Sequence, residues 1–277
     1  MTQIDVLVTV RRDAASRYYK NLASFAEINL TLVTDINEAF EVLESRDNHV
    51  DVLVLDSHLE QAHQMILELR YTYPRLLIVV VDEEADFAIP GNADDVSTAP
   101  FDNEDLIRRI KRLMSERRLE TLRADTIPHV REFAKKLRKA VGETGKQQAA
   151  VSACRDLGFD YVAFYRLDTA NPLMLSLRAQ EGPLQLQAIA PQQATADDIV
   201  GWVAQTGQSR VASPQDEINY ALVVQAHLGS VACTAVGKPN AYGVIGAGRG
   251  EQGAITQQQG MLLELVSAQL AAVVTQE

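Results

Sequence analysis

Short apolar runs alternate with amphipathic stretches from the N-terminus to Arg117. The apolar runs are IDVLVTV, LTLV, VDVLVLD and LLIVVV, and helical spacing follows each of the first three. Strands that are apolar throughout need cover on both faces. The pattern therefore predicts an α/β unit, a parallel sheet with helices on both sides. Pro90 and Gly91 interrupt the chain between Val81 and Val96, so we expect a loop or one turn there and not a full helix.

Two apolar stripes at helical spacing come next, on either side of Pro128. The stripes are Leu106, Ile110 and Leu113, then Val130, Phe133, Leu137 and Val141. Proline breaks the interior of a helix but is tolerated in its first turn. We therefore predict one helix from Asp105 to Arg117 and a new helix that starts near Thr126.

Beyond residue 146 the pattern changes to short strands joined by turns. The predicted strands are 161–167, 174–180, 231–236 and 242–248, with the turns DTANP and GKPNA inside the two pairs. Helices are predicted at 147–157, from Asp197 to a stop at Gly207, and at 257–274. The second half is therefore expected to be an α+β unit with an antiparallel sheet. We divide the chain into 1–116, a helical connector at 117–145, and 146–277.

Acidic residues outnumber basic ones in the chain as a whole. There are 37 Asp or Glu and 26 Lys or Arg among 277 residues, a net charge of -11 at pH 7. Because nucleic-acid affinity comes mostly from clustered positive charge, a nucleic-acid partner is disfavoured. The connector is basic, with 12 Lys or Arg against 7 Asp or Glu between Asn103 and Gly145. These charges interleave with apolar positions, as on an ordinary solvated helix face.

The sequence predicts a cytoplasmic protein without membrane contact. Its longest apolar run, LLIVVV, is strand-sized, and the N-terminal MTQIDVLVTVRRD places its arginines after the apolar run, unlike a secretory signal. The two cysteines, Cys154 and Cys233, are too few for a disulfide framework or a Cys-rich zinc site. Both lie in apolar stretches that are typical of buried thiols.

Three segments resemble the receiver domain of response regulators: VDVLVLDSHLE, YPRLLIVVV and ADDVSTAPFDNEDL. They correspond to the third strand, the fourth strand, and the final strand, loop and helix of that family. The resemblance spans residue 4 to about residue 116 and implies a flavodoxin-like, doubly wound parallel sheet of five strands. It places Asp56 where receivers carry the aspartate that accepts a phosphoryl group.

The positions that support phosphoryl transfer in that family are substituted in this chain. The resemblance implies that two acidic residues hold Mg²⁺, a Ser or Thr contacts the phosphoryl oxygen, and a Lys neutralises its charge. The corresponding residues here are Arg11 and Arg12, followed by Asp13, for the acidic pair, Asp82 for the hydroxyl, and Ala99 before Pro100 for the lysine. We interpret the unit as a pseudo-receiver without Mg²⁺, in which the two arginines can pair with Asp56. Atypical phosphorylation of Asp56 and a wrong register of the comparison are the alternatives.

Three later segments resemble a GAF domain: FDYVAFYRLD, DDIVGWVAQTGQSRVAS and YGVIGAGRGEQGAITQQQGMLLELVSAQLAAVV. The match runs from about Pro128 to Gln276, so the connector includes the first GAF helix. It implies a six-stranded antiparallel sheet whose first and last helices lie together, often as a dimer bundle. GAF domains bind cyclic nucleotides, linear tetrapyrroles, haem or no ligand. The sequence signatures of the first two groups are missing, so no cofactor is predicted and any ligand is unknown. Residues expected to border a pocket are Trp202, Tyr220 and His227.

The leading functional hypothesis is a non-enzymatic signal-transduction protein that couples a pseudo-receiver to a GAF module. Its output is expected to pass through another signalling protein, because no helix-turn-helix, kinase, cyclase or nucleotide-loop motif follows. The alternative is a response regulator that uses phosphorylation of Asp56 to control a ligand-binding GAF domain. An enzyme such as a GAF-type methionine sulfoxide reductase would need several cooperating cysteines.

A homodimer through the GAF and connector helices is also expected. The stripe after Pro128 and a second stripe on the last helix exceed what one face of a small sheet needs. The second stripe consists of Leu262, Leu265, Leu270 and Val273.

Overall fold

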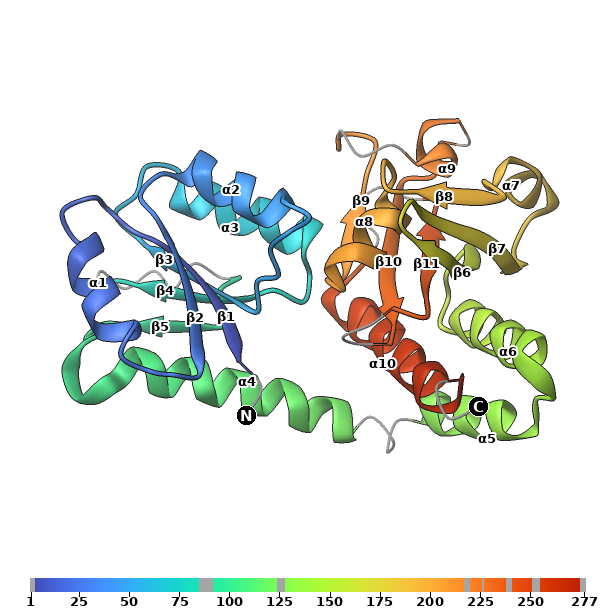
Figure 1. Ribbon diagram of the computed structural model, residues 1–277, viewed down its shortest axis with the longest axis horizontal. Helices are drawn as coiled ribbons and strands as arrows, with labels where there is room; N and C mark the ends of the chain where they lie inside the picture. Colours follow the sequence, from blue (N-terminus) through green and yellow to red (C-terminus); the bar gives the residue numbers. More distant parts are fainter. Residues whose placement is uncertain are drawn as a thin grey trace. The chain divides into compact units, whose positions relative to one another are not determined.

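The computed structural model describes residues 3–84, 92–123, 128–216, 220–225, 227–237, 241–250 and 255–274. The chain divides into two compact units (Figure 1). Unit 1 comprises Met1–Tyr71 and Leu76–Glu120, and unit 2 comprises Thr72–Arg75 and Thr121–Glu277.

A five-stranded parallel sheet forms the centre of unit 1. Its strands are β1 (Ile4–Thr9), β2 (Ile28–Val33), β3 (Val52–Asp56), β4 (Leu77–Val81) and β5 (Asp95–Ser97). They lie in the order β2-β1-β3-β4-β5, and every neighbouring pair is parallel. The predicted α/β unit with a parallel sheet is confirmed.

Helices cover both faces of this sheet, as its uninterrupted apolar strands require. The helices are α1 (Ala15–Leu22), α2 (Ile36–Glu44), α3 (Ala62–Thr72) and α4 (Asp105–Arg123), with a short 3₁₀ turn at Asp102–Glu104 before the last. Tyr18 of α1 and Ile110 of α4 share a core cluster with Val8 and Val54. Figure 1 shows α2 and α3 on the opposite side of the sheet.

The connector differs from the prediction at both of its helix ends. α4 continues to Arg123, past the predicted end at Arg117. Thr126 lies outside the described residues, and α5 (Pro128–Lys139) begins at the proline itself. Proline is favoured at the first helical position, where its missing N–H is not needed. The loop expected between Val81 and Val96 lies partly outside the described residues, since 85–91 are not among them.

Unit 2 contains a six-stranded antiparallel sheet, so the predicted α+β unit is also confirmed. The strands are β6 (Tyr161–Ala170), β7 (Leu173–Glu181), β8 (Gln193–Thr195), β9 (Arg210–Ala212), β10 (Ser230–Val236) and β11 (Gly243–Arg249). Their order is β8-β7-β6-β11-β10-β9. Turn residues 171–172 close the hairpin of β6 and β7, as the DTANP segment predicted.

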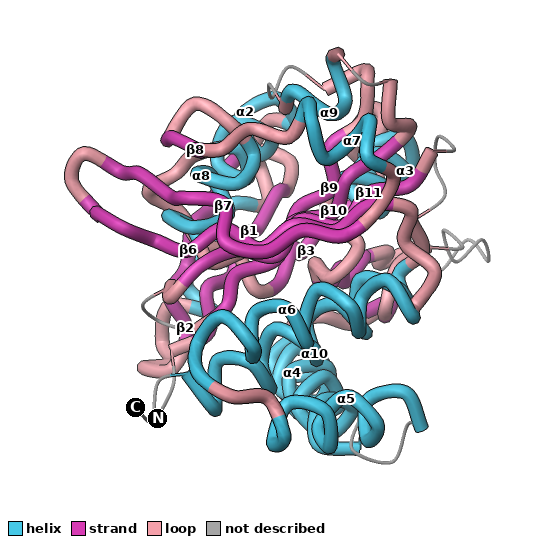
Figure 2. The backbone as a smooth tube through the Cα atoms, turned by 90° about the vertical axis from the view of Figure 1, so that its right-hand side faces the viewer, coloured by secondary structure: helices cyan, strands magenta, loops and turns pink. Residues whose placement is uncertain are grey.

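Within the described residues of unit 2, six helices accompany this sheet, in two groups. They are α5, α6 (Gly142–Asp156) and α10 (Gln257–Val274), then α7 (Leu184–Ile189), α8 (Ile199–Thr206) and α9 (Ala221–Val224). Figure 2 shows the first group on one side of the unit 2 strands and the second group on the other. Among the described residues, the structure contains no helix that is long and apolar enough to cross a membrane.

The apolar stripes that suggested a dimer are largely buried within one chain. Phe133 and Leu137 are 1% and 2% exposed in the core cluster that α5, α6 and α10 share with the sheet. Val130 is packed against Leu265. The helix ends at Lys139, so Val141 leaves the stripe and is 89% exposed. Most of the stripe residues are therefore covered by the sheet and the neighbouring helices of the same chain, while Leu262 and Val273 are partly buried, and the homodimer stays a prediction.

Candidate functional site

Asp56 lies at the carboxyl end of β3, in the middle of the unit 1 sheet. β1, β3 and β4 are parallel neighbours, so the segments that follow them meet at one edge of the sheet. β1 leads to β2, its neighbour on one side in the sheet, and β3 leads to β4, its neighbour on the other side. The two connections therefore run in opposite directions from the boundary between β1 and β3. In open α/β sheets, ligands bind at the carboxyl ends of strands beside such a point. Asp56 therefore occupies the position where this architecture favours a site.

Both carboxylate oxygens of Asp56 have partners, and its side chain is only 6% exposed. Arg11, which follows β1, donates its Nε–H to Oδ2 over 3.0 Å. The backbone N–H of His58 donates to Oδ1 over 3.0 Å, and Nδ1 of the same residue lies 3.2 Å from Oδ1. A guanidinium, an amide and an imidazole thus surround one carboxylate.

These contacts fix the charge of Asp56. Burial raises the pKa of its carboxyl, but the hydrogen bonds from His58 and Arg11 outweigh burial and leave the pKa below its ordinary value. The same hydrogen bond to Asp56 raises the pKa of Arg11. The pair is therefore ionised at neutral pH.

The other residues that the sequence placed in this pocket lie around it with different roles. The ion pair with Asp56 comes from Arg11, while Arg12 and Asp13 are exposed next to it in the sequence. Asp82 follows β4 and accepts the backbone N–H of Glu84 over 3.3 Å, a local turn contact.

Ala99 and Pro100 belong to the turn that leads into α4. Ala99 is exposed and Pro100 is buried, and their carbonyls accept hydrogen bonds from Asp102 and Leu106 over 3.1 and 3.2 Å. Neither side chain can supply the positive charge that a lysine would bring to Asp56.

The residues around Asp56 do not fit Mg²⁺. This ion takes oxygen ligands in an octahedral arrangement, mostly carboxylates and water. Here the Arg11 guanidinium lies against Oδ2, where its positive charge repels a second cation. We therefore assign no metal to this site.

His58 belongs to the site, although the sequence interpretation missed it. Its Nε2 lies 3.4 Å from Oε2 of Glu84, so its ring stands between Glu84 and Asp56. The sequence Asp-Ser-His could have predicted the backbone contact of His58 with Asp56, because aspartate often accepts the backbone N–H two residues later. The contact with Glu84 had no local signal.

Trp202, Tyr220 and His227, the expected border of a pocket in unit 2, have dissimilar environments. Trp202 is 3% exposed on α8, with the Arg210 guanidinium 5.0 Å from its ring centre. Tyr220 is 2% exposed, and its hydroxyl lies 3.4 Å from that of Tyr165. His227 is exposed and has a left-handed backbone, with φ of 54°. The two aromatic rings are core residues.

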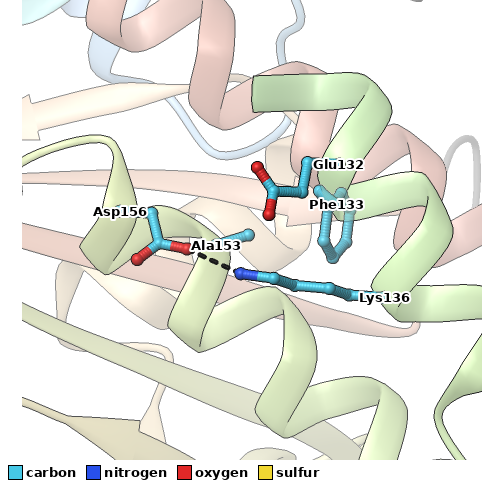
Figure 3. Close-up of a pocket in the computed structure, with 5 residues that line it drawn as sticks. All are labelled: Glu132, Phe133, Lys136, Ala153 and Asp156. Carbon is cyan, nitrogen blue, oxygen red and sulfur yellow. Dashed lines mark hydrogen bonds and ion pairs between the residues drawn. The ribbon is translucent and has the colours of Figure 1, made fainter. Parts of the chain in front are cut away.

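A small hollow in unit 2 lies between α5 and α6 (Figure 3). It is lined by Glu132, Phe133, Lys136, Ala153 and Asp156, and Nζ of Lys136 lies 3.0 Å from Asp156. Its volume of about 20 Å³ holds a water molecule or two, whereas ligand pockets span about 300–1,000 Å³. This hollow is too small to bind an organic ligand as it stands.

Both cysteines are buried free thiols, as the sequence predicted. Cys154 is 0% and Cys233 is 1% exposed. Burial raises the pKa of each thiol far above its ordinary value. Since the thiolate is the nucleophile, neither sulfur is set up for thiol chemistry.

Asp5, His49 and Asp51 place ligand-type atoms within 4.8 Å of one another. Protein groups already bind these atoms: Arg117 of α4 lies 2.8 Å from Oδ1 of Asp51, and Nε2 of His49 lies 3.3 Å from the same oxygen. Burial raises the pKa of Asp51, but the hydrogen bond with His49 and the charge of Arg117 outweigh it and lower the pKa to about 2. The cluster is an ionised anchor for α4, and we assign no metal to it.

Other basic side chains of α4 are also paired within unit 1. Arg109 lies 2.6 Å from Asp105 and 2.7 Å from Asp95, and Arg112 lies 2.6 Å from Asp95. Lys111 pairs with Glu27. These pairs neutralise positive charge in the first part of α4, and in the basic segment 117–139 Arg117 pairs with Asp51 and Lys136 with Asp156.

No protein-family model matches the sequence, and no curated protein matches it significantly.

Among solved structures, GAF domains are similar to about half of the chain. The GAF domain of a phosphoenolpyruvate-protein phosphotransferase from Acinetobacter has 16% identity and a TM-score of 0.45, over 53% of this chain and 91% of that one. The GAF domain of a phosphoenolpyruvate-protein phosphotransferase from Coxiella burnetii has 12% identity and a TM-score of 0.46, over 55% and 94%. Free methionine-R-sulfoxide reductase from Neisseria meningitidis has 14% identity and a TM-score of 0.44, over 53% and 89%. Likenesses at this level assign neither a family nor a function to the chain.

Proposed function

We propose that this chain is a non-enzymatic signal-transduction protein, in which a pseudo-receiver unit is coupled to a GAF-like unit. The observation that carries the proposal is the ion pair between Arg11 and the buried Asp56, with Nε and Oδ2 3.0 Å apart. The resemblance to receivers puts the phosphoryl acceptor at Asp56, and a guanidinium paired with that carboxylate opposes its phosphorylation.

The arrangement of the strands supports the receiver-like part of the proposal. The order β2-β1-β3-β4-β5 agrees with the flavodoxin-like order that the resemblance to receivers implied. In unit 2, α5, α6 and α10 share one core cluster with the antiparallel sheet, which agrees with the arrangement that the GAF resemblance implied. Architecture alone does not define function, so the proposal depends on the site.

Phosphoryl transfer is catalysed almost entirely by positioning and by neutralising charge. At Asp56 the acidic pair is replaced by Arg11 and Arg12, and the hydroxyl and lysine positions hold Asp82 and Ala99. Asp82 adds a negative charge near a site that would have to accept a phosphoryl group. The pocket thus lacks the groups that would bring a phosphodonor to the carboxylate and stabilise the product.

We propose that the signal leaves the chain through contacts with another signalling protein. The buried thiols of Cys154 and Cys233 argue against a reductase, and the paired cations of α4 argue against a nucleic-acid partner. A homodimer also remains part of the proposal, on a surface other than the buried stripes. Light scattering of the full chain at several concentrations tests it, since a mass that stays at 30.5 kDa excludes a dimer.

Amide NMR of the full chain with Mg²⁺ and beryllofluoride, a mimic of the phosphoryl group, tests the pseudo-receiver. We expect the resonances of Asp56, Ser57 and Glu84 to stay in place, while a functional receiver domain under the same conditions shows saturable shifts. Saturable shifts in this protein that disappear in Asp56→Asn would show that the pocket still binds a phosphoryl group.

A further inference from the structure

The imidazole ring of His58 lies between two carboxylates from different segments. Its Nδ1 is 3.2 Å from Oδ1 of Asp56 at the end of β3, and its Nε2 is 3.4 Å from Oε2 of Glu84 after β4. The His58 side chain is 28% exposed. One ring therefore joins the turn after β3 to the segment after β4.

The number of N–H groups on the ring determines which protonation state of His58 can form both contacts. An ionised carboxylate only accepts hydrogen bonds, and a neutral imidazole has a single N–H. A neutral ring would turn a nitrogen lone pair toward one of the two carboxylates. Only the imidazolium, with an N–H on each nitrogen, can donate to Asp56 and Glu84 together.

We propose that His58 is a proton-binding site that regulates the Asp56 pocket: the protonated ring bridges Asp56 to Glu84, and loss of the proton opens the bridge. The proposal rests on the proposed function, because it supplies an input to a pocket that does not take a phosphoryl group. In this pocket the ligand is a proton.

The groups around the ring indicate how the pocket changes when the proton is lost. The hydroxyl of Ser57 lies 3.3 Å from Nδ1 of His58 and can donate to it once that nitrogen is neutral. Asp56 keeps the backbone N–H of His58 and the Arg11 guanidinium. Glu84, which is 75% exposed, then loses the positive charge that held it. The four charges of Arg11, His58, Asp56 and Glu84 change from a net of zero to a net of one negative.

Other charged groups around the ring are occupied elsewhere or exposed. Glu83 pairs with Arg17 over 3.4 Å, and Asp82 accepts the amide of Glu84. Among the described residues of the loop after β1 and of α1, Arg12 and Asp13 are exposed and Tyr18 is buried. Burial lowers the pKa of His58, but the hydrogen bonds with Asp56 and Glu84 outweigh it and raise the pKa above its ordinary value.

The test is an NMR titration of the histidine rings in the full chain, with the His58 signal assigned from His58→Gln. We expect its midpoint to lie above about 6.5, the ordinary value for histidine. Glu84→Gln should lower the midpoint, and Asp56→Asn should lower it further. The backbone amide of Glu84 should titrate with the same midpoint as the His58 ring.

Glu83→Gln is the matched control, because it removes the same charge one residue away from a side chain that pairs with Arg17. A bridge predicts that Glu84→Gln lowers the midpoint more than Glu83→Gln does. Equal effects of the two variants, or a midpoint of about 6.5 or below in the unmodified chain, overturn the proposal. The failure of this proposal and the failure of the proposed function can be told apart. A phosphoryl adduct on Asp56 would refute the pseudo-receiver, but it would leave the titration of His58 in the unmodified protein unchanged.

Discussion

At the residue scale, Asp56 depends on protein groups and not on solvent for the stability of its charge. Arg11 and His58 lie on its two oxygens, and little of the side chain contacts water. A buried carboxylate with such partners is stable as an ion, but removing one partner leaves it under-solvated. Arg11 thus sets both the charge and the ligand preference of the pocket.

Arg11→Gln is expected to destabilise the protein at neutral pH by about 1 kcal/mol or less, because half of the arginine side chain is exposed and solvent screens the pair. The pKa of Asp56 is lowered in the folded state, so its contribution is present above the ordinary aspartate value of about 3.9 and is lost as the pH falls below it. Urea unfolding at pH 7 and at pH 3 measures the effect. A difference that is as large at pH 3 as at pH 7 contradicts the ion pair as its source.

Cys154 and Cys233 are predicted to resist alkylation in the folded protein. Both are buried with raised pKa values, so thiolate is scarce and reagents have no access. Intact mass after iodoacetamide at pH 8 should show no adduct, and two adducts after unfolding in guanidinium. Rapid modification of either thiol in the native chain would reopen the reductase hypothesis.

The sequence could predict part of the Asp56 site. Two arginines after β1 predicted a cationic partner, but they are adjacent residues, and only the turn geometry makes Arg11 the one that pairs with Asp56. The role of His58 could not be predicted, because its ring contacts Glu84 across two parallel strands. Such a contact depends on how two loop segments meet at the edge of the sheet and not on local spacing.

At the element scale, α4 is held to the sheet of unit 1 by ion pairs as well as by its apolar face.

Asp51→Asn is expected to lower the free energy of unfolding by roughly 2 kcal/mol at pH 7. This is the free-energy equivalent of a shift in the pKa of Asp51 from about 2 in the folded protein to its value in the unfolded chain. Because the folded pKa is lowered, the contribution is full above about pH 4 and is lost as the pH falls through about 2. Chemical denaturation of both proteins between pH 2 and pH 7 measures this, and an unchanged stability at pH 7 would contradict the anchor.

α5 provides a second test at this scale. Phe133→Ala should destabilise unit 2 by about 3–5 kcal/mol, because the ring is buried in the core. Val141→Glu is the control, since that side chain is 89% exposed and surface changes usually stay within about 0.5 kcal/mol. Thermal unfolding and light scattering separate stability from association. If Phe133→Ala halved the mass without lowering the stability, the residue would lie at a dimer interface after all.

Long elements with a strong pattern were predictable, and short ones were not. The runs that became β3 and β4 are continuous apolar segments, and their two-sided burial follows directly. β8 and β9 have three residues each and α9 has four, which is too short to show a period. α6 begins at Gly142, before the predicted start at Gln147, because its first turn has almost no apolar side chain to mark it.

At the scale of the whole molecule, two units with different architectures share one acidic chain. The net charge of -11 disfavours general nucleic-acid binding, and the positive charge that is present in α4 stabilises unit 1. The pseudo-receiver interpretation then requires that input reach unit 1 by something other than a phosphoryl group, which is the role that the His58 bridge would supply.

The most direct test of the pseudo-receiver is incubation of the full chain with acetyl phosphate and Mg²⁺, followed by intact mass spectrometry. We expect a single mass, because Arg11 pairs with Asp56 and a pseudo-receiver lacks the groups that assist phosphoryl transfer. A phosphoryl adduct of about 80 Da that is absent in Asp56→Asn would contradict the account and show that this carboxylate still accepts a phosphoryl group.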